Sequence, residues 1–223
     1  MNETRWMGGL VLALALGGQA LPAAWAQGRA DETGNAARPA SSATAQLNKA
    51  VLQQLPFADR ADFEAAQRGL VARFEGQIRN AAGKPVWDSH SYDFLDRDSA
   101  PDTVNPSLWR LAQLNRFAGL FKVTDGVYQL RGMDLANMTV IEGDSGLILI
   151  DPLMTSETAR AALELYYQHR PRRPVLAVVY THSHVDHFGG VRGVVQEDEV
   201  KSGKVKIFAP AGFMEHAISE NLF

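Results

Sequence analysis

The sequence predicts a mixed α/β fold, an α+β sandwich, and three patterns lead to this fold class. Short apolar runs form two hairpins, at 120–131 and 138–150, each around a turn rich in Gly and Asp. A helical period follows at 156–169, with apolar residues three and four positions apart. Val175–Tyr180 is then a continuous, valine-rich apolar run, which is typical of a strand buried on both faces.

The remaining elements are predicted from apolar periods and turn residues. Ahead of the hairpins they predict a helix at 45–55, a helix at 59–74, an irregular stretch from 83 to 106 and a short helix at 108–114. Behind the valine-rich strand they predict a short helix at 191–195, a charged loop at 197–203, a strand at 205–208 and a helix from Ala211 onward. This order is that of an αββα sandwich of which these residues supply the first half only.

Three segments are expected along the chain. Residues 1–26 have the pattern of a cleaved secretory signal, with an apolar stretch rich in Leu and Ala before Ala24-Trp25-Ala26. An uncleaved membrane anchor is the alternative, disfavoured because the apolar stretch is short. Residues 27–44 are expected to be a flexible mature N-terminus, and 45–223 a partial catalytic domain that is truncated at its C-terminal end. An exported protein is expected to be periplasmic or secreted.

Composition narrows the chemistry. The 223 residues include no cysteine, so any metal site must be built from His, Asp and Glu. The formal net charge of -3 gives no basic surface for a nucleic acid partner. The sequence contains neither a Gly-rich phosphate loop nor a serine-nucleophile motif.

Four side chains of metal-ligand type lie within six residues, directly after the valine-rich strand: His182, His184, Asp186 and His187. Alternate residues of an extended chain point the same way, so Asp186 is expected to share the direction of the first two histidines. The loop would present two imidazoles to one metal, and a carboxylate with an imidazole to a second. These ligands suit zinc, and we predict two Zn²⁺ ions per complete site.

This arrangement predicts a hydrolase. Two metals about 3.5–4 Å apart hold the attacking and leaving oxygens, and zinc-bound water with a pKa of about 7 supplies hydroxide as the nucleophile. Asp186 is therefore predicted to be catalytic as well as a ligand. The position at the carboxyl end of a strand supports this, because ligands of open α/β sheets gather there. Gly189 and Gly190 let the backbone approach the site closely.

Other polar candidates carry weaker signals. Asp151 closes a predicted strand before Pro152, and two interpretations stay open: it orients a ligand histidine, or it is a turn carboxylate. His216 is expected to be an ordinary surface or packed histidine. His90 and His169 are expected to be loop and helix-end residues.

Three aromatic residues, Trp87, Tyr92 and Trp109, also have two interpretations. They line an apolar substrate channel, or they are plain core aromatics. The core is favoured for all three.

Thr181 to Gly190 resembles the first metal-binding motif of the metallo-β-lactamase superfamily. The wider sequence is similar to the secreted alkyl sulfatases, which hydrolyse detergents such as dodecyl sulfate. The similarity runs from about Asn48 to the last residue, and the stretches that carry it are 56–60, 103–110, 127–132 and 180–190. A metallo-β-lactamase-like αββα fold is therefore expected.

The resemblance implies hydrolysis of linear primary alkyl sulfate esters by a binuclear zinc site, with His182, His184, Asp186 and His187 as ligands. The remaining ligands, two acidic residues and a further histidine, are implied to lie downstream of the motif. A small-molecule alkyl sulfate is the expected partner, and a homodimer is expected through a helical domain absent here. A sterol-carrier-like domain is absent as well.

Two alternatives stay open on the residues alone. The first is another hydrolase of the same fold, acting on a lactam, an ester or a thioester, because a fold does not fix a substrate. The second is an inactive fragment that lacks the second half of the metal site.

Overall fold

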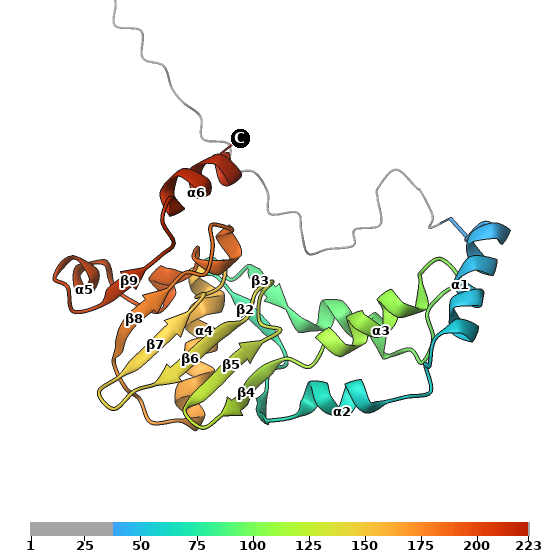
Figure 1. Ribbon diagram of the computed structural model, residues 1–223, viewed down its shortest axis with the longest axis horizontal. Helices are drawn as coiled ribbons and strands as arrows, with labels where there is room; N and C mark the ends of the chain where they lie inside the picture. Colours follow the sequence, from blue (N-terminus) through green and yellow to red (C-terminus); the bar gives the residue numbers. More distant parts are fainter. Residues whose placement is uncertain (1–37, 223) are drawn as a thin grey trace, which may run out of the picture.

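The computed structural model describes residues 38–222, and its centre is a mixed sheet of seven strands in the order β1-β4-β5-β6-β7-β8-β9 (Figure 1). The bounds of these strands are Leu70–Arg73, Gly119–Thr124, Val127–Arg131, Met138–Glu142, Leu147–Ile150, Val175–Val179 and Lys206–Phe208. A small second sheet pairs β2 (Gln77–Arg79) with β3 (Pro85–Asp88). The predicted mixed α/β class is confirmed.

Strand pairing is antiparallel from β1 to β7 and parallel from β7 to β9. Both predicted hairpins are confirmed, as β4–β5 and β6–β7. The predicted helix at 156–169 is α4 (Ser156–His169), which joins β7 to β8. Since β7 and β8 are parallel, their carboxyl ends meet at one edge of the sheet, and the histidine motif begins there.

Helix α4 covers one face of the sheet and forms the main core with it (Figure 1). Strand residues on this face are completely buried, among them Leu120, Leu130, Val140, Leu149 and Val178. At the N-terminal end of the helix, Thr155 and Thr158 form a capping box. The buried carboxylate of Asp134 accepts from Met154 N at 3.2 Å and from the Thr158 hydroxyl, so the start of α4 is fixed to the loop after β5.

Glu142 at the end of β6 fixes the other end of α4. Its carboxylate accepts from Tyr166 Oη at 2.6 Å, and from Arg170 Nε at 2.8 Å and Nη2 at 2.9 Å. The Arg170 guanidinium holds the pKa of Glu142 below its usual range. Burial, together with the Glu142 carboxylate, raises the pKa of Tyr166. The two ends of α4 are therefore attached to the loop after β5 and to the end of β6.

The opposite face of the sheet carries apolar side chains that are partly exposed. Ile148 alternates with buried Leu147 and Leu149 along β7, and it is 37% exposed. Phe208 is in register with Val179 and is 56% exposed. An αββα sandwich covers such a face with a second sheet, so one large sheet with helices on one side is what the first half of that fold supplies.

Two boundaries in the N-terminal part differ from the prediction. Helix α1 (Ser42–Gln54) begins ahead of residue 45, because the Ser41 hydroxyl caps it by accepting from Thr44 N at 3.2 Å. Residues 42–44 are thus helical, and assigning them to a flexible N-terminus was wrong. The expected signal at 1–26, and residues 27–37, lie outside the described residues.

The helix predicted over 59–74 is shorter and is followed by a strand. Helix α2 (Ala61–Gln67) ends before Gly69, whose φ of 77° is left-handed and favours glycine. The Gly69 carbonyl accepts from Lys122 N at 2.7 Å, which turns the chain into the sheet as β1. The prediction of one long helix was therefore wrong.

The remaining elements include two regular segments that were predicted as irregular. The stretch from 83 to 106 contains β3 and the 3₁₀ helix η1 (Ser89–Asp96), and the charged loop contains α5 (Glu197–Lys201). The other predicted helices are present as α3 (Pro106–Asn115), the 3₁₀ helix η3 (Val191–Gly193) and α6 (Phe213–Leu222). Among residues 38–222, no helix is long and apolar enough to cross a membrane.

Two adjacent tyrosines of α4 test the packing of this helix. Replacing Tyr166 by Phe removes a donor to the Glu142 carboxylate, so we expect unfolding free energy to fall by about 2 kcal/mol. Replacing Tyr167 by Phe removes a hydrogen bond to the Arg173 carbonyl, and we expect a loss of about 1 kcal/mol. Urea denaturation followed by circular dichroism measures both. Equal losses would contradict the role given to Glu142.

Candidate metal centre

The motif occupies the loop that follows β8. His184 has extended backbone angles, φ -68° and ψ 136°, and Val185–His187 then forms the 3₁₀ turn η2. The turn changes the direction of the side chains after His184. The prediction that Asp186 shares the direction of His182 and His184 through an extended backbone was therefore wrong, although all four side chains remain neighbours.

His182 and His184 form the first pair of donors. His182 Nε2 lies 3.1 Å from His184 Nδ1, and the ring centroids are 4.6 Å apart. The other nitrogen of His182, Nδ1, lies 2.9 Å from Thr181 Oγ1. The Thr181 hydroxyl donates to Asp151 Oδ2 at 2.7 Å, so its oxygen is left to accept from His182 Nδ1–H. This leaves the lone pair of His182 on Nε2, the atom that faces His184.

Asp186 and His187 form the second pair. His187 Nε2 lies 3.4 Å from Asp186 Oδ2. On the far side of the ring, His187 Nδ1 lies 2.8 Å from Asp151 Oδ2 and donates to it. The side chains of this pair are more enclosed than His184, with exposed fractions of 23% for His187, 27% for Asp186 and 63% for His184.

Asp151 orients a histidine of the motif, which decides between its two interpretations. Its carboxylate is buried and accepts from Thr181 N at 2.8 Å, from the Thr181 hydroxyl and from His187 Nδ1. The backbone of Asp151 has a left-handed φ of 54°, which Asp and Asn adopt more readily than most residues. One carboxylate at the end of β7 thus holds two parts of the loop after β8.

The separations within each pair fit a metal ion. Two ligands that bind zinc at about 2.0–2.1 Å with tetrahedral angles lie about 3.3 Å from each other. The two pairs are separated by 3.1 Å and 3.4 Å, and the rings of His182 and His187 are 4.0 Å apart, centroid to centroid. No group of three or more His, Asp and Glu residues in the described chain converges on one cation position. Each pair is therefore suited to supply two ligands of a larger set.

Gly189 and Gly190 place the motif against the loop that follows β7. A Cβ on Gly190 would lie 2.2 Å from the Pro152 carbonyl oxygen and 2.6 Å from that of Thr155. Gly190 N donates to the Leu153 carbonyl at 2.9 Å. The close approach at Gly190 is therefore to the backbone of the loop after β7, whereas the prediction placed it at the metal site.

The aromatic candidates lie away from the motif. Trp109 is buried, so the core interpretation holds for it. Trp87 and Tyr92 are in contact, with centroids 6.1 Å apart, and they line a groove of about 1110 Å³ between the sheet edge and the N-terminal helices. None of the four donors lines this groove. Trp87 also packs against the main core, as the core interpretation predicts, whereas Tyr92 is exposed.

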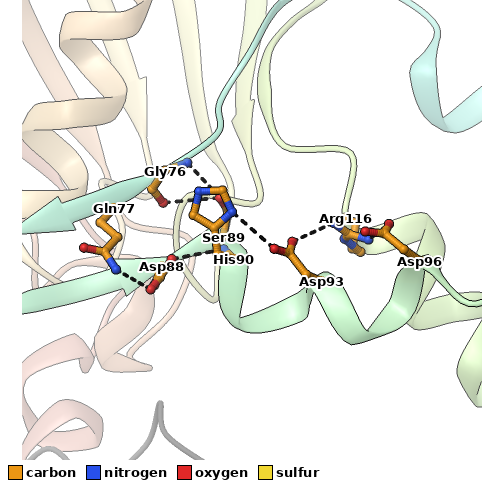
Figure 2. A network of polar contacts seen from close by, with 8 residues as sticks. All are labelled: Gly76, Gln77, Asp88, Ser89, His90, Asp93, Asp96 and Arg116. Atoms are coloured by element: carbon orange, nitrogen blue, oxygen red, sulfur yellow. Dashed lines mark hydrogen bonds and ion pairs between the residues drawn. The ribbon is translucent and has the colours of Figure 1, made fainter.

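His169 and His216 are where the sequence predicted them, whereas His90 lies in a 3₁₀ helix and not in the expected loop. His90 lies in η1, where Figure 2 shows its ring beside Asp93, with Nδ1 and Oδ2 3.3 Å apart. Asp93 also accepts from Arg116 Nη2 at 3.1 Å, so this network ties η1 to the end of α3. His169 and His216 are exposed, at the end of α4 and on α6.

Known proteins match this chain over most of its length. Residues 131–223 match the profile of the family described as Metallo-beta-lactamase superfamily. The solved structure of the stereoselective inverting sec-alkylsulfatase Pisa1 from Pseudomonas sp. is 65% identical, with a TM-score of 0.80 over 84% of this chain and 30% of that chain. Residues 131–223 are thus similar to part of a metallo-β-lactamase superfamily domain. The expected fold, and the resemblance that predicted it, are confirmed.

Two curated relatives are similar over comparable lengths. An (R)-specific secondary-alkylsulfatase from Pseudomonas sp. is 65% identical over 185 residues, which are 83% of this chain and 28% of the relative. A linear primary-alkylsulfatase from Pseudomonas sp. is 55% identical over 188 residues, again 83% of this chain and 28% of the relative. The chain thus spans less than a third of the length of these relatives.

Substitution of Gly190 tests how tightly the metallo-β-lactamase motif is packed. We expect Gly190→Ala to lower the unfolding free energy by at least about 2 kcal/mol, because the added methyl overlaps backbone oxygens that cannot rotate away. Gly143→Ala is the control, since its nearest neighbour, the Gly146 carbonyl oxygen, lies 3.2 Å from the added Cβ in an exposed turn. Thermal unfolding compares the two, and similar melting temperatures would show that the loop can move apart.

Proposed function

We propose that this chain is the motif-bearing part of an enzyme that hydrolyses alkyl sulfate esters at a binuclear zinc site. The observation that carries the proposal is the similarity to alkylsulfatases over 83% of the chain. The two donor pairs of the motif support it, because their separations suit zinc. Linear primary alkyl sulfates such as dodecyl sulfate are the proposed substrates, and secondary alkyl sulfates are the neighbouring class.

Four side chains would hold the metal. His182 Nε2 and His184 Nδ1 would bind one ion, and Asp186 Oδ2 and His187 Nε2 the other. Zinc, when bound, supplies a Lewis acid that lowers the pKa of water and withdraws charge from the ester oxygens. The protein's part is to keep the donor atoms deprotonated and aimed, which Asp151 does for His187 by accepting from Nδ1–H.

Location and assembly are part of the same proposal. The apolar segment before Ala24-Trp25-Ala26 supports export to the periplasm or the medium. The histidine and carboxylate donors need no reducing compartment, which agrees with export. A homodimer would form through residues beyond those of this chain.

Sulfate release from dodecyl sulfate, and from a secondary alkyl sulfate of equal chain length, tests the activity. We expect activity that a chelator abolishes and Zn²⁺ restores. We expect His187→Ala to lower the activity by more than the roughly 10–100-fold that follows loss of a residue that only hydrogen-bonds to a ligand. His216→Ala is the control, because this exposed histidine lies outside the motif. Activity that chelation leaves unchanged would contradict the metal mechanism, and hydrolysis of a β-lactam or thioester instead would favour the alternative substrates.

Asp151→Asn tests the orientation of His187 separately from catalysis. The amide tolerates the left-handed backbone of residue 151, but its NH₂ group cannot accept from both His187 and Thr181. We expect zinc affinity, measured by competition with a chromophoric chelator, to fall about 10–100-fold. Asp144→Asn, in the exposed turn between β6 and β7, is the matched control. Unchanged affinity in Asp151→Asn would contradict the assigned role.

A further inference from the structure

Helix α6 is attached to the motif loop at both of its ends. At the start of the helix, the Phe213 ring lies 5.4 Å from that of Tyr180 and 5.1 Å from that of Phe188, centroid to centroid. Tyr180 and Phe188 flank the motif on its two sides. Towards the end of the helix, Glu220 Oε2 accepts from Ser183 Oγ at 2.8 Å. The Glu220 carboxylate is thereby held beside the motif by a buried hydroxyl.

The same carboxylate oxygen faces His184. His184 Nε2 lies 3.8 Å from Glu220 Oε2, which is about 1 Å longer than a hydrogen bond. The other ring nitrogen, Nδ1, faces His182 Nε2 at 3.1 Å. Glu220 is therefore on the side of the His184 ring that is turned away from the donor pair. Glu220 is therefore not part of the donor pair, and it lies where a hydrogen-bond partner of His184 Nε2 would lie.

We propose that Glu220 is a positioning residue for His184, and this inference rests on the metal site proposed above. Its carboxylate accepts the proton of His184 Nε2 and so leaves the lone pair on Nδ1, directed at the metal. A small rotation of the ring or of the carboxylate closes the remaining distance when a cation draws Nδ1 inward. Carboxylate partners of this kind fix the ring and raise the basicity of the ligand nitrogen.

The other two histidines have such a partner, which makes the pattern complete. Asp151 accepts from His187 Nδ1–H, and Thr181 Oγ1 accepts from His182 Nδ1–H. With Glu220 at His184 Nε2, all three rings direct an unprotonated nitrogen at a donor pair. The lone pairs of His182 Nε2 and His184 Nδ1 would then face each other at 3.1 Å, an arrangement that a cation held by both nitrogens would stabilise.

Glu220→Ala and Glu220→Gln, made in the full chain, test the inference. We expect Glu220→Ala to weaken binding of Zn²⁺ by about 10–100-fold in chelator competition. Glu220→Gln is expected to lose less, because its amide oxygen still accepts from Nε2–H. The second readout is the Nε2–H proton resonance of His184 in the zinc-loaded chain, which should be protected from exchange in the natural protein and in Glu220→Gln, and lost in Glu220→Ala.

Glu215→Ala is the matched control, because Glu215 is an exposed acid in the first turn of the same helix. Circular dichroism melts of each variant separate a loss of affinity from a loss of structure, and the conservative Gln variant keeps the test open if Ala unfolds the helix. If Glu220→Ala leaves both the zinc affinity and the protected Nε2–H proton unchanged, the role of Glu220 is overturned and the proposed metal site still stands. A natural chain that binds no zinc would overturn the proposed metal site, and the inference with it.

Discussion

The carboxylate of Asp151 is the constraint on which the geometry of the motif depends. It closes β7, yet all three of its hydrogen bonds go to the loop after β8, at Thr181 and His187. A buried carboxylate without such partners would cost several kcal/mol, so the arrangement is stable only while β7 and β8 are adjacent. The sheet register that pairs Ile150 with Val179 is therefore also what aims His187.

Helix α4 maintains that adjacency. It is the only helix between β7 and β8. Its start is tied to Asp134 in the loop after β5, and its end to Glu142 of β6. The loop from β7 into α4 includes two left-handed residues that are not glycine, Asp151 and Leu153. Such conformations cost of order 1–3 kcal/mol each and persist where the surroundings enforce them. Here the surroundings are the helix cap on one side and Gly190 on the other.

The sequence was sufficient to predict a secondary-structure element where the pattern that marks the element is local. The hairpins and α4 have turn residues and apolar periods that do not depend on distant partners, and their bounds match closely. The errors occur where a distant partner decides. Residues 70–73 extend an apparent helical period, but pairing with β4 makes them a strand after the left-handed Gly69. Asp186 was assigned its direction from an extended backbone, whereas the hydrogen bond of His187 N to the His184 carbonyl closes a turn.

The site divides in the same way. The four metal-type side chains are close together in sequence, so residue type alone was enough to make them candidates, whereas the groups that hydrogen-bond to them come from three separate elements. For Asp151 the sequence left two interpretations open, because its role depends on β7 and β8 being adjacent. Thr181, Ser183 and Glu220 carry no signal of their own, because a threonine, a serine or a glutamate gains meaning here only from the ring nitrogen or hydroxyl that it faces. The residue types of the motif are those that suit a zinc ion, and the fold decides which nitrogen of each ring is left unprotonated.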